Sequence, residues 1–333
     1  MLIKSFPELD NIHAIAVPLP VQKQLITANV YVVGSGPVTL IDTGPKMPGF
    51  LDLIRQQLNR AGLDFKDVTR IIATHGHMDH VGLATQIRRA AGHPVEVFIH
   101  PGDLRLVSKE SFRDNRWSKK ADELMTWIGV PVDEISKIKQ HFASFSEWYD
   151  PVDPVSFLKD GDEFSGKGYH LKVIHTPGHT AGSVCLYESK QKILFSGDCL
   201  IKHITPNPFI EVEKFRLQNP EYQSLSAFID SLERLARLDV RYVYSGHGEY
   251  IDDLKNLISG YKTHHRERMN LIRQALKRRA RPLYAIIDDV FPFVPEGDLF
   301  LAVSEILVHL EVLMNEGRAE LVAPGPPAIF AAR

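Results

Sequence analysis

The hydrophobic and polar positions of this chain follow two periods. Short runs that are β-branched or alternate between apolar and polar residues predict strands, at residues 12–17, 29–34, 38–44, 67–74, 95–100, 171–174, 193–195 and 240–244. Stretches with apolar residues three and four positions apart predict amphipathic helices, at residues 48–62, 82–91 and 221–237. The order of these elements predicts an α/β (α+β) protein built as a four-layer αββα sandwich.

One region interrupts this order. Residues 102–160 are helical and charged at first and then aromatic, and they hold all three tryptophans, Trp117, Trp127 and Trp148. We expect a helical insertion that reaches over a site, with Trp117 and Trp148 as candidates to touch an apolar substrate. A homodimer contact, or a small subdomain that packs its own core, are the alternatives for these aromatic residues.

The C-terminal part has a different composition. It predicts a long helix at 254–280, a short helix at 282–292, a third helix at 299–315 and two short strands at 318–322 and 328–332. A length of 333 residues fits one larger and one smaller domain, and we place them at 1–257 and 258–333. Three helices followed by a hairpin resemble a winged helix.

Composition excludes some classes of partner. A formal net charge of −2 gives no strong overall attraction to nucleic acid or to an anionic membrane. No apolar run approaches the ~18 residues of a transmembrane helix, and the first ten residues lack a signal-peptide core. Cys185 and Cys199 are expected as buried apolar residues in a reducing compartment. These features predict a cytoplasmic protein without a membrane partner.

The candidate chemistry starts in the sequence T-H-G-H-M-D-H-V-G. It places His75, His77, Asp79 and His80 between a predicted buried strand and a helix. Two histidines two positions apart in an extended segment can point the same way, whereas the aspartate and histidine in the turn can face a second point. Imidazole nitrogen and carboxylate oxygen suit zinc, and they also suit iron or manganese.

The H-x-H-x-D-H spacing resembles the signature of the metallo-β-lactamase fold superfamily. Members complete the site with a later His, a bridging Asp and a last His, and T-P-G-H-T-A-G-S, L-F-S-G-D and Y-S-G-H-G supply His179, Asp198 and His247. The resemblance covers residues 12–257 and implies two ligand sets bridged by Asp198. The first ligand set is His75, His77 and His179, and the second ligand set is Asp79, His80 and His247.

The resemblance implies metal-assisted hydrolysis. Two divalent ions, zinc before iron or manganese, lower the pKa of a shared water toward ~7 and present it as hydroxide. They also polarise a carbonyl or phosphoryl oxygen, while Asp79 accepts and relays the proton. Asp42 in L-I-D-T-G is implied to orient a ligand histidine, with a plain strand-end turn as the alternative. The proline-rich loop after Asp198 offers three candidates to touch the substrate, Lys202, His203 and Asn207.

The function of the site has three alternatives, of which two differ in the bond that is cleaved. The motifs look most like hydroxyacylglutathione hydrolase (glyoxalase II) relatives, which are thioesterases, but that enzyme's glutathione-binding features are not recognisable here. A thioester, ester or lactone of a small molecule is therefore the first expectation. RNA phosphodiester hydrolysis is the second, because a mitochondrial β-lactamase-like ribonuclease carries a similar tail; the helix at 299–315 has no Lys or Arg, which disfavours nucleic acid. A non-catalytic metal-binding regulatory protein is the third.

Overall fold

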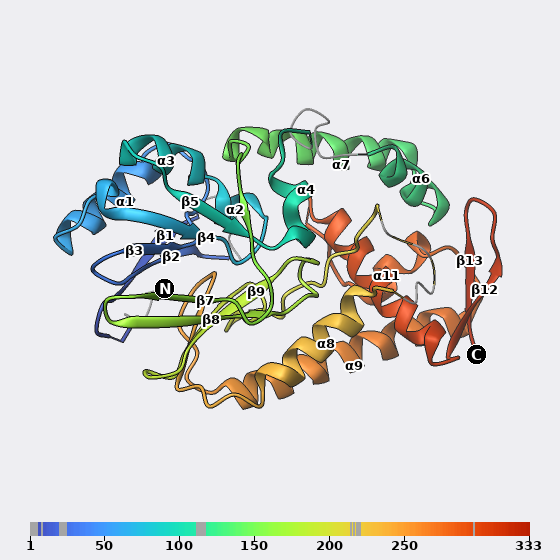
Figure 1. The fold of residues 1–333 in the computed structure, drawn as a ribbon. Helices are drawn as coiled ribbons and strands as arrows, with labels where there is room; N and C mark the ends of the chain where they lie inside the picture. Colours follow the sequence, from blue (N-terminus) through green and yellow to red (C-terminus); the bar gives the residue numbers. More distant parts are fainter. Residues whose placement is uncertain are drawn as a thin grey trace.

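The computed structural model describes residues 6–7, 9–19, 25–110, 118–213, 215, 217, 221–295 and 297–333. Two sheets lie face to face in its larger part (Figure 1). In spatial order, the first sheet contains β1 (Ile12–Pro18), β2 (Thr27–Val33), β3 (Val38–Ile41), β4 (Val68–Ile72), β5 (Glu96–Ile99) and β6 (Ser156–Phe157). The second contains β11 (Tyr242–Ser245), β10 (Ile193–Gly197), β9 (Val184–Glu188), β8 (Tyr169–His175) and β7 (Glu163–Gly166).

Strand β2 illustrates how the strands are buried on both faces. Its side chains alternate, so Val30 and Val32 pack against the helices outside the first sheet. Tyr31 and Val33 pack between the two sheets. Because both faces are covered, every residue of β2 is buried and the strand is a nearly continuous apolar run.

Helices cover the outer face of each sheet. On the first sheet, α1 (Phe50–Arg60) and α3 (Ala84–Ala91) contribute buried apolar side chains to the outer core. On the second sheet, α8 (Ser224–Leu235) and the first turns of α9 (Leu254–Arg278) do the same. This arrangement confirms the predicted αββα sandwich. Cys185 and Cys199 lie buried and free in the outer core of the second sheet, as predicted.

The insertion and the C-terminal part share one core. The helices of the insertion are α4 (Leu104–Val107), α6 (Lys119–Trp127) and α7 (Val132–Ser144). The C-terminal elements are α10 (Ile287–Val290), α11 (Leu299–Asn315), β12 (Ala319–Ala323) and β13 (Ile329–Ala332). Leu124 and Ile138 of the insertion pack in the same cluster as Leu276 and Leu307 of the C-terminal helices. The insertion therefore does not form a separate core of its own, which was one of the predicted alternatives.

The short elements are α2 (Met78–Val81), η1 (Phe65–Asp67), η2 (Pro101–Asp103), η3 (Phe145–Trp148) and η4 (Tyr284–Ile286). The division expected between residues 257 and 258 falls within α9. Leu254 and Ile258 at the start of α9 pack on the second sheet, whereas Ile272 and Leu276 near its end belong to the core shared with the insertion. Helix α9 thus runs through both parts as one continuous helix. Among the described helices, none is long and apolar enough to cross a membrane.

Candidate metal centre

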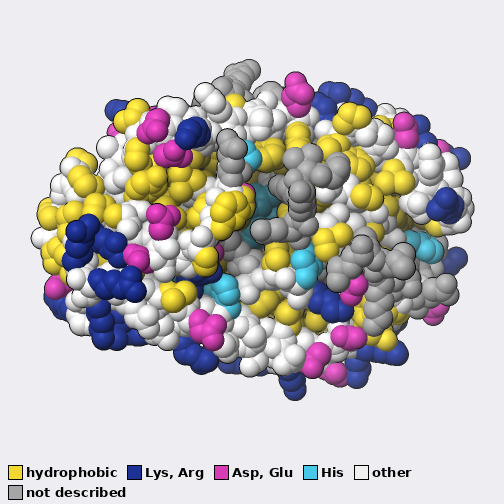
Figure 2. All heavy atoms as spheres, turned by 180° about the vertical axis from the view of Figure 1, so that it is seen from behind, with side chains coloured by type: hydrophobic (Ala, Val, Ile, Leu, Met, Phe, Trp, Pro, Cys, Tyr) yellow, Lys and Arg dark blue, Asp and Glu magenta, His cyan; other side chains and the backbone are white. Residues whose placement is uncertain are grey.

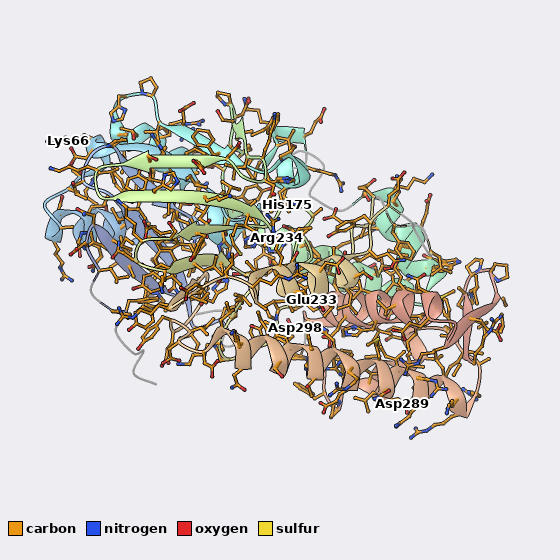
Figure 3. The ribbon with its side chains drawn as sticks, turned by 60° about the horizontal axis from the view of Figure 1, so that its bottom comes forward. Lys66, His175, Glu233, Arg234, Asp289 and Asp298 are labelled. Carbon is orange, nitrogen blue, oxygen red and sulfur yellow. The ribbon has the colours of Figure 1, made fainter. Side chains whose placement is uncertain are left out.

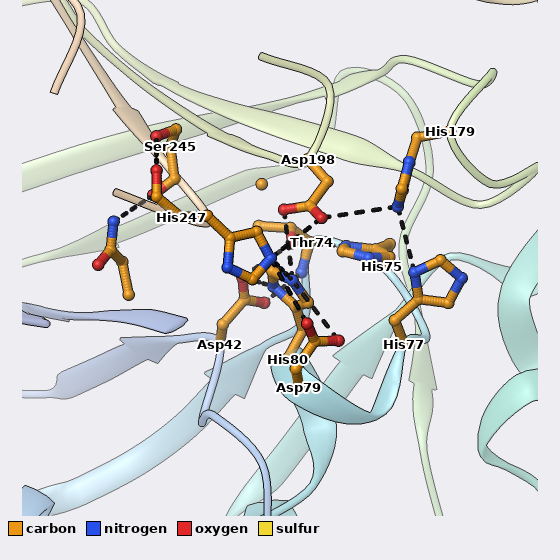
Figure 4. Close-up of polar contacts among 12 residues, drawn as sticks. Asp42, Thr74, His75, His77, Asp79, His80, His179, Asp198, Ser245 and His247 are labelled. Atoms are coloured by element: carbon orange, nitrogen blue, oxygen red, sulfur yellow. Dashed lines mark hydrogen bonds and ion pairs between the residues drawn. The ribbon is translucent and has the colours of Figure 1, made fainter. Parts of the chain in front are cut away.

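The strands deliver the predicted site residues to one edge of the sandwich. Strand β3 runs parallel to β4, β10 runs parallel to β11, and β8 and β10 both run antiparallel to β9. The carboxyl ends of β3, β4, β8, β10 and β11 lead into the loops that carry these residues at one edge, a common location for sites in α/β proteins. Figure 4 shows the side chains that converge there: Asp42, His75, His77, Asp79, His80, His179, Asp198 and His247.

The ligand atoms form three groups, each with all of its atoms within 4.8 Å of one another. These groups are His75, His77 and His179; His75, His80 and Asp198; and Asp79, His80 and His247. The first and third groups have the composition of the first and second ligand sets, and the middle group places Asp198 beside both. The His/Asp cluster can therefore hold metal ions.

The inward-facing ring nitrogens lie within hydrogen-bonding distance of one another. The His77 Nδ1 and His179 Nε2 atoms are 3.1 Å apart, and the His80 and His247 Nε2 atoms are 3.2 Å apart. The buried Nε2 of His75 has no hydrogen-bond partner among the described residues. A buried polar nitrogen without a partner is costly, and a cation would satisfy it together with the neighbouring nitrogens.

The outward-facing nitrogens explain how the rings are oriented. Nδ1 of His247 lies 2.6 Å from the carbonyl oxygen of Thr27, and Nδ1 of His179 lies 3.0 Å from that of Asn207. A carbonyl oxygen only accepts hydrogen bonds, so each Nδ1 carries the hydrogen. In the neutral ring, Nε2 then presents its lone pair to the centre, which is the tautomer a metal ligand needs.

Asp198 is the negative charge at the middle of the cluster. Its Oδ2 lies 3.1 Å from Nε2 of His247 and 3.6 Å from Nε2 of His179, and its Oδ1 lies 3.3 Å from Nε2 of His80. Burial raises the pKa of this carboxyl, but His247 and His80 outweigh burial and hold it well below its usual range. Asp198 is therefore ionised at neutral pH and attracts cations.

The pKa values of the buried histidines shift in two directions. Burial lowers the pKa of His75 well below its ordinary value and also lowers that of His179. Burial acts in the same direction on His80, but the carboxylates of Asp198 and Asp42 outweigh it and raise the pKa of His80. His75 and His179 are therefore neutral donors, as metal binding requires.

The end of β8, which leads to His179, is fixed from the outside by α8. Arg234 points toward His175 (Figure 3) and donates to its carbonyl oxygen at 3.3 Å. Arg234 also forms an ion pair with Asp160 at 2.8 Å. Nε2 of His175 in turn lies 2.9 Å from the carbonyl oxygen of Ala181. These contacts join the end of β8 to α8 and to the loop that carries His179.

The predicted substrate candidates have different positions. Asn207 is joined to the cluster, because its carbonyl oxygen holds His179 and its side-chain amide donates to Leu301 of α11 at 2.9 Å. Lys202 is exposed and pairs with Glu249 at 2.9 Å. Of the contacts described for this loop, the bond from His179 to Asn207 is the one that reaches a proposed ligand.

Of the remaining candidates, His203 and Trp148 lie in the described part of the chain and Trp117 does not. The exposed ring of His203 lies against the backbone of Gly248, next to His247 in the sequence. Trp148 packs edge-on against Phe145 with ring centroids 5.0 Å apart, and its carbonyl oxygen accepts the N–H of Lys46 at 2.6 Å. Trp117 lies outside the described residues.

Two residues next to the cluster were missed by the sequence analysis. The ring of Phe209 lies edge-on to both His77 and His179, with centroids 5.2 Å apart in each case. Phe209 belongs to the proline-rich loop, where only polar residues were considered. Asp103 is completely buried and contacts both loops that carry the first ligand set. An acidic residue in the P-G-D turn directly after a buried strand was the available signal.

Figure 2 shows histidine side chains at the bottom of a hollow in the middle of one face of the molecule. The cluster is largely buried, with His75, His80 and His247 at most 1% exposed. Asp79 is 9% exposed, and its side chain is open to solvent at 12%. The cluster therefore reaches solvent at Asp79 and at His77, which is half-buried.

An αββα sandwich with His and Asp clusters at its strand ends defines a class of metal-binding proteins that are generally metal-dependent hydrolases. The family model described as "Metallo-beta-lactamase superfamily" matches residues 25–247, and the chain belongs to this superfamily. The chain is 28% identical over 310 residues to a "Probable metallo-hydrolase YqjP" of Bacillus subtilis (strain 168), covering 92% of this chain and 93% of the relative. It is 27% identical over 301 residues to a "Beta-lactamase-like protein 2 homolog" of Drosophila melanogaster, covering 87% and 83%.

Solved structures share the whole fold. A metallo-beta-lactamase family protein from Thermus thermophilus superimposes with a TM-score of 0.81 and 27% identity, over 98% of this chain and 99% of that chain. A beta-lactamase domain protein from Burkholderia ambifaria has a TM-score of 0.78 at 20% identity, over 98% and 94%. The likeness extends over nearly the full chain, so the insertion and the C-terminal helices belong to a recurring architecture.

Proposed function

We propose that this protein is a hydrolase that uses two divalent metal ions, zinc before iron or manganese, to cleave a thioester, ester or lactone of a small molecule. The observation that carries the proposal is the convergence of two three-residue ligand sets on one carboxylate, Asp198. A single structural ion would need only one of these sets. Two sets that share a carboxylate are typical of two-metal hydrolytic sites.

The residues of the chain divide the work of such a site. When bound, the ions supply an ionised water and polarise the acyl oxygen of the substrate. The rings of His179 and His247 are held by the carbonyl oxygens of Asn207 and Thr27, so their orientation does not depend on a bound metal ion. Oδ2 of Asp79 lies 3.5 Å from Nε2 of His247, and this partly exposed carboxylate would be the group that accepts the proton of the water.

The surroundings of the cluster favour an acyl substrate over RNA. Phe209 lies against the rings of the first ligand set, and Phe300 of α11 follows it in a stacked arrangement with centroids 6.5 Å apart. Phe142 of the insertion contacts Phe300 edge-on at 5.1 Å. Phe300 and Phe142 belong to the core shared by the insertion and the C-terminal helices, so the half-buried ring of Phe209 is the part of this series that can meet an apolar acyl group. Helix α11, which carries Phe300, has no Lys or Arg to bind phosphates.

The test is a substrate panel with the metal-loaded protein. Thioesters, esters and lactones of increasing acyl length are compared with single-stranded RNA. We expect hydrolysis of at least one acyl substrate, and a loss of at least about 100-fold in kcat/KM in His77→Ala. His93→Ala is the matched control, since His93 is half-buried, lies outside both ligand sets and bonds to the carbonyl oxygen of Lys66. Cleavage of RNA alone, lost in His77→Ala, would transfer the proposal to a ribonuclease.

A further inference from the structure

We propose that Asp103, a residue outside both ligand sets, is a positioning residue that fixes the distance between the two loops carrying the first ligand set; the inference rests on the proposed function. Asp103 lies in η2, directly after β5, and is 0% exposed. The hydrogen bonds of its carboxylate go to Gly76, Thr180 and Gly182, which are not among the predicted ligands. It acts through the backbone next to them.

Each oxygen of the carboxylate accepts hydrogen bonds from the residues beside the histidines. Oδ2 accepts the N–H of Gly76 at 2.8 Å, between His75 and His77, and also the hydroxyl of Thr180 at 2.7 Å, next to His179. Oδ1 accepts the N–H of Gly182 at 2.7 Å. One buried carboxylate therefore joins two loops that are about a hundred residues apart in the sequence. Buried charge-assisted hydrogen bonds of this kind are short and directional.

The two loops pack so closely against Asp103 that a side chain would not fit at Gly76 or Gly182. A Cβ atom placed on Gly182 would lie 2.5 Å from Cγ of Asp103. One placed on Gly76 would lie 3.1 Å from Cβ of Asp103 and 2.8 Å from that of Leu106. Glycine at both positions allows the two loops to approach the carboxylate from opposite sides.

The effect of this contact is confined to one ligand set. The distance of 3.1 Å between Nδ1 of His77 and Nε2 of His179 spans the same two loops that Asp103 joins. The rings of the second ligand set are held elsewhere, His80 by Asp42 and His247 by the backbone of Thr27. Removal of the Asp103 carboxylate should therefore weaken the first ligand set and leave the second intact.

The experiment measures metal binding rather than activity. Apo protein is titrated with Co²⁺, whose visible absorption reports ligand geometry, and Zn²⁺ affinities are measured by competition with a chelating dye. In Asp103→Asn, the amide presents a donor to groups that are themselves donors. We expect one ion to bind as in the wild type and the other about 10- to 100-fold more weakly, with an altered absorption band.

Thr180 provides a second, milder pair of variants. Thr180→Val keeps the shape but removes the hydroxyl donor to Asp103, and Thr180→Ser keeps that donor. We expect the valine variant to weaken the same ion and the serine variant to bind both ions normally. Ile54→Val, in α1 on the outer face of the first sheet, is the control for a general loss of stability.

The outcomes separate the two proposals. The role of Asp103 would be overturned if Asp103→Asn or Thr180→Val bound both ions as tightly as the wild type does. It would also be overturned if a variant bound both ions more weakly to the same extent. Weakening by Ile54→Val of the same ion would also overturn it. A wild type that binds two ions but hydrolyses no acyl substrate contradicts the proposed function alone. A wild type that binds fewer than two ions contradicts both.

Discussion

The carboxylate of Asp42 accepts a hydrogen bond from Nδ1 of His80 at 2.9 Å. It also accepts the backbone N–H and the hydroxyl of Thr74 at 2.7 and 2.8 Å. Because the Thr74 hydroxyl donates to Asp42, it accepts from Nδ1 of His75 at 3.2 Å. One carboxylate thus orients a ring from each ligand set, directly for His80 and through Thr74 for His75.

Asp42→Asn tests this contact without changing the backbone. Asp42 has a φ of 60°, in the left-handed region that asparagine also tolerates. We expect the variant to fold and to bind metal about 10- to 100-fold more weakly, since the ring of His80 loses its charged acceptor. Calorimetric Zn²⁺ titration measures the loss. Asp64→Asn, which changes an exposed cap of η1, should bind as the wild type does; equal losses in both variants would contradict the assignment.

Asn207→Ala tests whether α11 supports the first ligand set. Removal of the amide that donates to Leu301 loosens the backbone carbonyl that holds His179. A single hydrogen bond contributes about 1 kcal/mol, so we expect about a fivefold weaker affinity for one of the two ions. Zn²⁺ competition titrations measure it, with Lys202→Ala on the same loop as the control. An unchanged affinity would show that the loop holds His179 without α11.

Phe209→Ala tests the aromatic contribution to substrate binding. The ring lies against His77 and His179, and its loss removes apolar surface without removing a ligand. We expect KM for a long acyl substrate to rise about tenfold, while kcat for a short acyl substrate changes by less than about threefold. Steady-state kinetics with a chain-length series measures both. A uniform fall in kcat across the series would mean that Phe209 supports the metal ligands instead.

Glu311→Gln tests a buried carboxyl on α11. Burial raises the pKa of Glu311 to about 8. A carboxyl whose pKa is higher in the folded than in the unfolded chain is held protonated by folding, so stability falls as pH rises between the two pKa values. We expect the variant to gain stability relative to the wild type by up to about 1.4 kcal/mol per pH unit between about pH 5 and pH 8. Urea unfolding at several pH values measures the difference; a constant difference would contradict the shift.

The sequence predicted those parts of the site that follow strand ends. His75, His77, Asp79 and His80 share one short segment, and each later ligand follows a recognisable apolar run, so strand order alone brings them to one edge. The expectation that Asp42 orients a ligand histidine came from the family resemblance, and in the structure its carboxylate lies 2.9 Å from Nδ1 of His80.

The parts that the sequence did not predict depend on long-range packing. Asp103 and Asn207 act through contacts that span roughly thirty to a hundred residues, and neither side chain has a local pattern that names its partner. The shared core of the insertion and the C-terminal helices was missed for the same reason. An amphipathic helix shows which face is buried but not against which other helix.

The hydrogen bond between Asn207 and Leu301 has a consequence for biosynthesis. Every proposed metal ligand lies at or before residue 247, whereas the helix that supports the His179 loop begins at residue 299. A chain that emerges from the ribosome N-terminus first exposes all the ligands before this support exists. The contact that supports the His179 loop is therefore made by a helix that is synthesised after every proposed ligand.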